Sequence, residues 1–165
     1  MSTIPESRIK NLINEMLDIL YKKDSFLLKK ELDITERAIT HRMGMYLQQI
    51  IPEYDVDCEY NRMGKMEFGT VHYTEGDYFA KTVALSEGSV NDSDDTGSRV
   101  YPDIIVHKRG TALNIVIIEV KVKWKSAKSG HDMKKLNAYK SDLFYEYAFY
   151  IELGEKRKDV MIKPM

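Results

Sequence analysis

The chain has 165 residues, of which 43% are hydrophobic and 31% charged, and its formal net charge is −1. This composition is typical of a globular protein rather than a disordered one, and the length suits one domain with a sizeable core. Cys58 is the only cysteine, which excludes an internal disulfide and a cysteine-rich zinc site. No segment approaches the roughly 20 apolar residues that span a bilayer, and the N-terminus lacks the pattern of a secretory signal. We therefore expect a cytoplasmic protein with no membrane partner.

The charges are unevenly distributed along this nearly neutral chain. Seven lysines and a single acid lie between Lys121 and Lys140, whereas four acids and no base lie between Ser86 and Asp95. Such polarisation is compatible with one basic face for nucleic acid. An ordinary solvated surface explains the same lysines, so charge alone leaves both interpretations open.

The first third of the chain has the spacing of two helices. Apolar residues recur every three to four positions over about 7–22, with Ser7 as a plausible N-cap. A second helix is predicted over about 35–50, opened by Asp33 or Thr35 and closed before Pro52. The alternating stretch YDVDCEYNR then predicts a strand, and EFGTVHYTEGDYFA a hairpin or extended excursion.

The remaining segments predict an α/β domain. A flexible polar loop is expected over about 86–99, followed by strands in PDIIVH and ALNIVIIEVKVKW, which the turn KRGT separates. A helix in GHDMKKLNAYKSDLF, a strand in EYAFYIEL and a final strand in RKDVMIKPM complete the chain. This order indicates a mixed β-sheet flanked by helices, in a single domain over 1–165. The β-branched run Ile115–Ile118 is typical of a central strand covered on both faces.

Three charged residues interrupt these apolar strands. Because side chains alternate along a strand, Glu119 and Lys121 share one face while Ile118 and Val120 share the other. Asp103 stands at the start of the preceding strand, directly after a proline. These charges are explained if they form one site at the end of a sheet.

The register between the two strands decides whether the acids meet. A tight KRGT turn would set Asp103 opposite Val116, whereas a longer loop, about Arg109–Leu113, sets it opposite Glu119. In the second case the two carboxylates lie about 5 Å apart and repel unless a cation lies between them. Magnesium, which takes oxygen ligands, suits such a pair.

These residues resemble a known motif. Pro102-Asp103, followed by Glu119-Val120-Lys121 after the apolar run NIVII, resembles the motif of the PD-(D/E)XK nuclease superfamily. The superfamily has a restriction-endonuclease-like αβββαβ core, which corresponds to the elements predicted from about Asp33 to Leu153. The segments DCEYNR, PDIIVHKRG, NIVIIEVK and DMKKL also look like a group of small uncharacterised prokaryotic members.

The resemblance implies a metal-dependent nuclease that hydrolyses phosphodiester bonds, of DNA in particular. Asp103 and Glu119 would bind Mg²⁺, for which Mn²⁺ substitutes, with the Val120 carbonyl as a further ligand. Lys121 would activate or orient the attacking water, and Glu36 matches the acid that many members carry on the helix before the first core strand. The alternative is a catalytically silent module of the same fold that binds nucleic acid or supports an assembly.

Further residues are candidates for contact with nucleic acid. His107, Arg109, Lys123 and Lys135 are the predicted phosphate contacts, although HKRGT is equally well an ordinary polar turn. Asp57 and Glu59 share a strand face, and either supplement the metal site or face solvent. A homodimer would suit cleavage of both strands of a duplex.

Overall fold

A computed structural model describes residues 4–60 and 101–165, and between them only the backbone of six short strands; the side chains of 126–132 lie outside the description. Three α-helices and the five strands of one sheet make up the main layers of the fold. The helices are α1 (Glu6–Lys23), α2 (Glu36–Ile50) and α3 (Ser129–Asp142). The strands of the main sheet are β1 (Asp55–Asp57), β8 (Ile104–His107), β9 (Asn114–Val122), β10 (Tyr147–Leu153) and β11 (Met161–Pro164).

The main sheet is mixed, with the order β1-β8-β9-β10-β11. β9 and β10 run parallel, with α3 as the crossover between them, and the other three pairs are antiparallel. The predicted α/β class with a mixed sheet is therefore confirmed.

The 3₁₀ segments are η1 (Ser25–Leu28), η2 (Lys30–Leu32), η3 (Lys123–Lys128) and η4 (Arg157–Asp159). The short strands pair as β2 (Arg62–Gly64) with β5 (Tyr78–Ala80), β3 (Met66–Glu67) with β4 (Thr70–Val71), and β6 (Thr82–Val83) with β7 (Ser98–Arg99).

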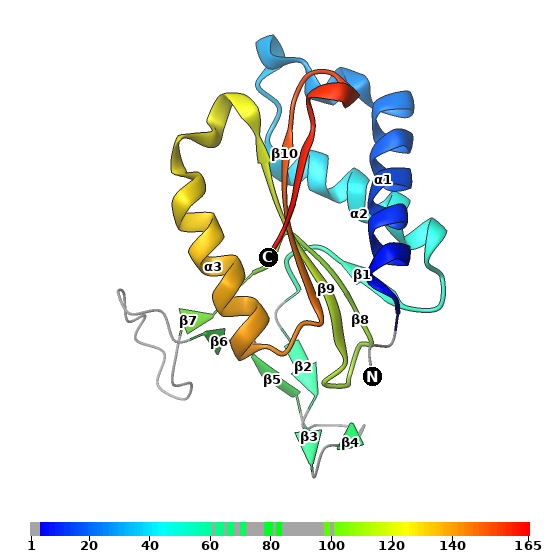
Figure 1. Ribbon diagram of the computed structural model, residues 1–165, viewed down its shortest axis with the longest axis vertical. Coiled ribbons are helices and arrows are strands. Elements are labelled where there is room, and N and C mark those ends of the chain that lie inside the picture. The colour runs from blue at the N-terminus through cyan, green and yellow to red at the C-terminus, as the bar shows by residue number, and fades with distance from the viewer. Residues whose placement is uncertain are drawn as a thin grey trace.

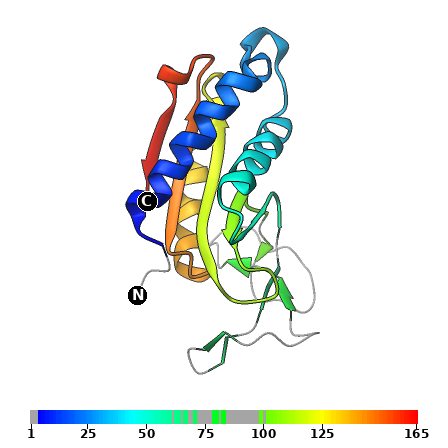
Figure 2. The same cartoon turned by 90° about the vertical axis from the view of Figure 1, so that its right-hand side faces the viewer.

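The helices cover both faces of the sheet, with α1 and α2 on one side and α3 on the other (Figures 1 and 2). Val116 and Ile118 of β9 belong to the core beneath α1 and α2. Ile117 belongs to a second core with Leu136 and Tyr139 of α3. β9 is thus a central strand buried on both faces, as its β-branched run predicted.

The helix starts differ in part from the prediction. α1 begins at Glu6, with Pro5 as its N-cap at φ −61°, so the prediction of Ser7 as the cap is wrong. Proline fixes a φ close to the helical value and leads into the first turn without a side-chain cap. Thr35 caps α2 as predicted, because its Oγ1 accepts a hydrogen bond from the Ala38 N–H at 3.4 Å. Asp33 instead has a left-handed φ of 44° at the end of η2.

The strand predicted in YDVDCEYNR is shorter than its alternation indicated. Only Asp55–Asp57 pairs with β8, and Glu59 then takes a left-handed φ of 55° while its N–H donates to the Pro102 carbonyl at 2.9 Å. The loop predicted over 86–99 lies outside the described residues apart from β7. In the described part of the chain, no helix is long and apolar enough to cross a membrane.

Candidate active site

The β8–β9 ladder settles the register that the sequence left open. Ile104 pairs with Ile118 and Ile105 with Ile117, so one further step along both strands places Asp103 beside Glu119. The connection runs from residue 108 to 113, and the ladder is irregular between Val106 and His107. The longer of the two loops considered is therefore the one present, and KRGT forms a turn inside it, in which the Thr111 N–H donates to the Lys108 carbonyl at 3.2 Å.

β9 continues for four residues, 119–122, past the residue that pairs with the start of β8, and two carboxylates bond to this unpaired strand edge. The backbone N–H of Val120 donates to Asp103 Oδ2 at 2.8 Å, and that of Val122 donates to Glu36 Oε2 at 3.1 Å. N–H groups two residues apart point to the same strand edge. Asp103 and Glu36 therefore take the place of a neighbouring strand along this part of β9, a role that the sequence pattern does not predict.

Glu36 also brings α2 into the site. It is the first residue of α2, where the helix dipole favours a negative charge. Its Oε1 lies 3.5 Å from Nζ of Lys121, so the same carboxylate holds both the strand edge and the lysine. The predicted association of Glu36 with the motif residues therefore has a direct geometric basis.

Glu119 is buried, with 7% of its surface exposed. It lies two residues after Ile117 and therefore on the face of β9 that α3 covers. Glutamate is among the residues least often buried. Its burial beside a second carboxylate marks this end of the sheet as chemically distinct from the apolar core.

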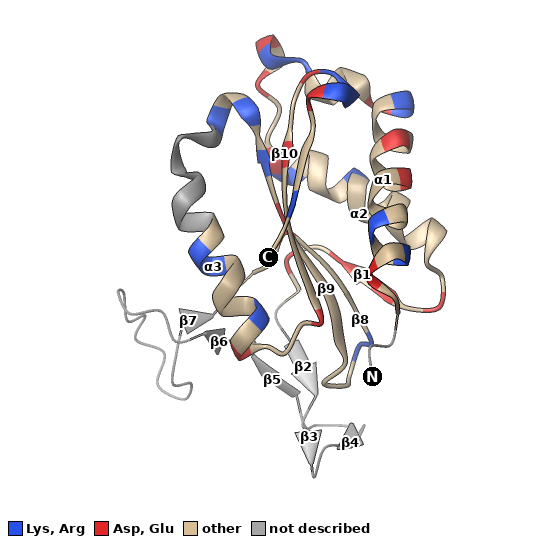
Figure 3. Cartoon of the chain, in the orientation of Figure 1, with Lys and Arg blue, Asp and Glu red and all other residues tan. Residues whose placement is uncertain are grey.

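Electrostatics tie the members of the cluster together. Burial raises the pKa of Asp103 to about 6, against the lowering effect of the hydrogen bond from Val120. Glu36 raises this pKa further, whereas Lys135 and Lys121 lower it. Lys135 belongs to α3, so charges from α2, α3 and β9 meet around Asp103. Figure 3 shows described basic residues at the start of η3 and along α3.

His107 and Arg109 lie at the opposite end of β8 and contact Asp57. His107 is 1% exposed, and its Nε2 lies 2.8 Å from Asp57 Oδ2. Arg109 donates from Nε to the same oxygen at 2.7 Å, and from its backbone N–H to Asp55 at 2.9 Å. Phosphate contact by these two residues stays a prediction, and phosphate would compete with Asp57 for Arg109.

The carboxylates of β1 have partners of their own. Burial pushes the pKa of Asp57 upward, but the hydrogen bonds from His107 and Arg109 outweigh it and hold the pKa well below its usual range. Glu59 forms an ion pair with Arg37 at 3.1 Å. The structure thus gives both acids partners among basic side chains, whereas the sequence left a role at the metal site open.

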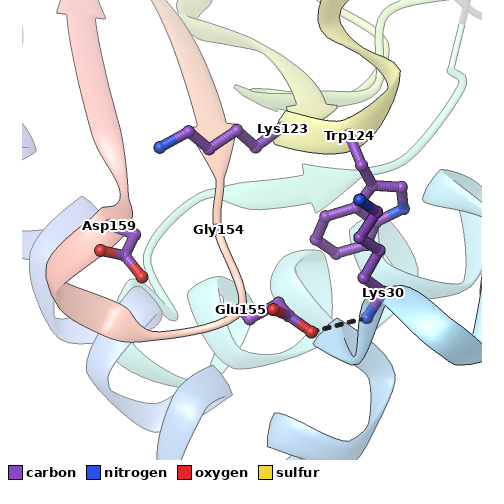
Figure 4. Close-up of a pocket in the computed structure, with 6 residues that line it drawn as sticks. All are labelled: Lys30, Lys123, Trp124, Gly154, Glu155 and Asp159. Carbon is purple, nitrogen blue, oxygen red and sulfur yellow. Dashed lines mark hydrogen bonds between the residues drawn. The ribbon is translucent and has the colours of Figure 1, made fainter.

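Lys123 lies apart from the carboxylate cluster. It begins η3 and lines a cavity with residues from η2, from η4 and from the end of β10 (Figure 4). Its predicted contact with nucleic acid would therefore take place beside this cavity rather than over Asp103.

The carboxylates of this cluster can be compared with the ligands that different metal ions require. Across residues 4–60 and 101–165, apart from the side chains of 126–132, no group of three or more His, Cys, Asp or Glu side chains is placed to enclose a metal. Asp103 and Glu119 supply two carboxylates, and the Val120 carbonyl points to the same strand edge as its N–H. Magnesium is commonly held by one or two carboxylates and keeps several waters, so these residues fit it better than an ion that needs a full protein cage.

Fold and site together define an α/β protein with a mixed sheet. A cluster of carboxylates and a lysine lies where the central strand β9 extends beyond its neighbour β8. Comparison of the chain with protein-family models, with curated proteins and with solved structures gave no match.

Proposed function

We propose that the chain is a metal-dependent nuclease with a restriction-endonuclease-like core that hydrolyses phosphodiester bonds of nucleic acid, DNA in particular. The observation that carries the proposal is the β8–β9 register, which sets Asp103 beside Glu119 with Lys121 two residues further on the same strand face. The order α2, β1, β8, β9, α3, β10 also corresponds to the αβββαβ core of the nuclease superfamily that the motif resembles.

Asp103 and Glu119, with the Val120 carbonyl, are the residues that would hold Mg²⁺ or Mn²⁺. Bound there, the ion supplies Lewis-acid polarisation of the scissile phosphate and lowers the pKa of water. A carboxylate has two oxygens, so the hydrogen bond from Val120 engages Oδ2 of Asp103 and leaves Oδ1 to face an ion.

Lys121 has the geometry of a positioned cation. Glu36 holds its ammonium group at 3.5 Å while bonding the Val122 N–H, which fixes the lysine relative to the strand that carries Glu119. A fixed ammonium group orients the attacking water or compensates charge that develops on the phosphate. Glu36 is then a positioning residue that acts through Lys121.

Lys135 extends the positive potential from the site onto α3. It is close enough to Asp103 to lower the pKa of that carboxyl, and its ammonium group lies 5.9 Å from the ring centre of Tyr139. A lysine at this place suits contact with the phosphate next to the scissile one. Affinity that depends on such contacts weakens steeply with added salt.

A second function, nucleic-acid binding without chemistry, is favoured by one observation. Asp103 and Glu36 already bond to backbone N–H groups of β9, so both carboxylates have hydrogen-bond partners that do not depend on a metal. A catalytically silent module would keep these carboxylates only to hold the strand edge. Such a protein would bind nucleic acid without metal, and a variant of Asp103 that folds would bind equally well.

The two functions are separated by titrating Mg²⁺ and Mn²⁺ into the protein by calorimetry, followed by cleavage assays on linear, flapped and branched DNA. Asp103→Ala and Glu119→Ala are expected to abolish metal binding and cleavage. Glu53→Gln is the matched control, because Glu53 is an exposed acid that lies beyond the end of α2 and pairs with Arg8 of α1. Absence of metal binding and of cleavage in folded wild-type protein, with DNA present, contradicts the nuclease proposal. Light scattering of the same samples tests the predicted homodimer.

A further inference from the structure

A cavity of about 350 Å³ lies where β9 passes into η3 and β10 runs on towards η4 (Figure 4). Lys30 and Trp124 are drawn on one side of it, and Lys123 and Asp159 on the other, with Gly154 and Glu155 between them. Its volume falls within the range of small-molecule sites, roughly 300–1,000 Å³. Nothing in the proposed catalytic cluster uses these residues.

The lining has an unusual chemical mixture. Two amines, two carboxylates and one indole ring surround the cavity. With two amines and two carboxylates the lining is neutral overall, which does not favour a bare phosphate, and four charged groups disfavour a purely apolar ligand. A nucleobase fits this mixture, because it has an aromatic face and an edge that carries both hydrogen-bond donors and acceptors.

The cavity is close to the proposed site of cleavage. Lys123 begins η3 directly after β9, two residues beyond Lys121 and four beyond Glu119, and four residues of strand span about 13 Å. A nucleotide adjacent to a phosphate bound over Asp103 and Glu119 can therefore place its base in the cavity.

The walls of the cavity are fixed by contacts of their own. Glu155 Oε1 accepts a hydrogen bond from the Lys30 N–H at 3.0 Å, and the Gly154 carbonyl accepts one from the Tyr21 hydroxyl at 2.6 Å. A Cβ added at Gly154 would lie 2.5 Å from Cβ of Asp159, so the chain there is as close as glycine allows. Walls held in this way reduce the ordering cost of binding.

We propose that this cavity receives the unstacked base of the nucleotide next to the scissile phosphate, with guanine as the preferred base. The inference rests on the proposed nuclease function for its nucleic-acid ligand. Guanine presents O6 and N7 as acceptors for lysine, and its ring N–H and amino group face one carboxylate with two parallel donors. Trp124 offers a surface for stacking, and uracil or thymine, which lacks an amino group, binds least well.

Trp124 provides the measurement, because it is the only tryptophan in the chain. Its fluorescence is followed while GMP, AMP, CMP, UMP or inorganic phosphate is added to the metal-free protein. We expect saturable quenching by GMP, with UMP about tenfold weaker, which corresponds to one charge-assisted hydrogen bond. Glu155→Gln and Asp159→Asn are each expected to weaken GMP binding about tenfold or more, and Glu53→Gln is expected to leave it unchanged.

Glu155→Gln is the decisive variant, because glutamine keeps an oxygen for the Lys30 N–H while it removes the charge. Equal quenching by all four nucleotides or by phosphate alone overturns the assignment, as does GMP binding that neither variant alters. Cleavage of DNA without GMP binding overturns the cavity assignment and leaves the nuclease proposal standing. GMP binding without metal binding or cleavage supports the cavity as a base site and overturns the nuclease proposal.

Discussion

The side chain of Asp103 accepts a hydrogen bond from the backbone N–H of Val120 at 2.8 Å, just before β8 begins and where β9 continues without a paired strand. The residue therefore has a structural task, which is to occupy a strand edge, and a proposed chemical task, which is to hold an ion. Burial near Glu36 makes its charge costly, since these effects raise the pKa of Asp103 to about 6. A metal ion would relieve that cost.

Asp103→Asn is expected to stabilise the metal-free protein at pH 8. The folded-state pKa of about 6 lies above the ordinary value of 3.8, so the folded protein binds this proton more tightly than the unfolded chain does. Wild-type stability therefore falls as the pH rises from about 4 to about 6, by up to about 3 kcal/mol, while the asparagine variant escapes this loss. Urea unfolding of both proteins between pH 4 and pH 8 measures the difference.

Saturating magnesium is expected to reverse the order of stability at pH 8. Metal at about 1,000 times its Kd stabilises the wild type by about 4.1 kcal/mol, which exceeds the loss of about 3 kcal/mol, and Asp103→Asn should gain little. Equal stabilisation of both proteins by magnesium would mean that the ion binds elsewhere. A stability gap that does not change with pH would contradict the proton linkage.

Two substitutions of Glu36 are expected to distinguish its hydrogen bond to the edge of β9 from its positioning of Lys121. Glu36→Gln keeps an acceptor for the Val122 N–H but loses the ion pair with Lys121, whereas Glu36→Ala loses both contacts. We expect alanine to cost about 1 kcal/mol more than glutamine in unfolding free energy. Both variants should lower kcat of DNA cleavage about 10- to 100-fold with KM little changed, because they misplace Lys121.

The pH profile of cleavage distinguishes a role of Glu36 in positioning Lys121 from a purely structural role, because a purely structural role would leave the profile unchanged. If Glu36 acts through Lys121, the basic limb of the profile shifts in Glu36→Gln as the lysine loses its carboxylate neighbour. Glu53→Gln serves again as the exposed control. A glutamine variant with wild-type kcat and profile would reduce Glu36 to a strand-edge residue.

The sequence predicted the elements of this fold because their patterns are local. The β-branched run of β9 and the three-to-four spacing of α1 report burial directly, and both elements occur where the patterns lie. The β8–β9 register was not predictable in the same way. It depends on a six-residue connection and on an irregularity after Val106, and neither has a periodic signal in the sequence.

In the candidate site, too, some features follow from local sequence patterns and others depend on long-range contacts. The pairing of Asp103 with Glu119 followed from the motif once the longer loop was assumed, but the bond from Glu36 to the Val122 N–H joins residues 86 positions apart. The hydrogen bond between His107 and Asp57 likewise joins two strands, β8 and β1, whose pairing is set by the tertiary structure. Partners of charged side chains depend on three-dimensional placement, which a pattern of residue types does not specify.

Asp57→Ala is expected to destabilise the protein by about 1–3 kcal/mol at pH 7, since it leaves the buried His107 ring without its carboxylate. The pKa of Asp57 is held well below its ordinary value. Its contribution is therefore fully present above about pH 4 and is lost as the pH falls through the lower folded-state pKa. Denaturant unfolding at pH 7 and at pH 3 should show the gap between variant and wild type narrowing in acid.

Glu59→Ala is the matched comparison, because Glu59 pairs with the exposed Arg37 and its loss should cost about 0.5 kcal/mol or less. Equal losses in the two variants would contradict a special role for the buried histidine. The Asp57 variant should also leave metal binding intact, since Asp57 bonds to His107 and Arg109 rather than to the carboxylate cluster.

Gly44 and Cys58 are expected to be energetically coupled. Gly44 is buried in α2, and a Cβ added there would lie 2.7 Å from Sγ of Cys58, whose thiol donates to the Thr40 carbonyl at 3.4 Å. Alanine gains about 1 kcal/mol over glycine inside a helix, whereas overpacking costs about 1–3 kcal/mol. Gly44→Ala alone should therefore be neutral or destabilising in the wild-type background.

Removing the sulfur should change the sign of that effect. In a Cys58→Ala background the added methyl group fills the space of the thiol, so Gly44→Ala is expected to stabilise the protein by up to about 1 kcal/mol. The four proteins form a double-mutant cycle with a favourable coupling of about 1–3 kcal/mol, measured by urea unfolding at pH 7. Additive effects within about 0.5 kcal/mol would contradict the contact, because residues that do not touch rarely couple more strongly than that.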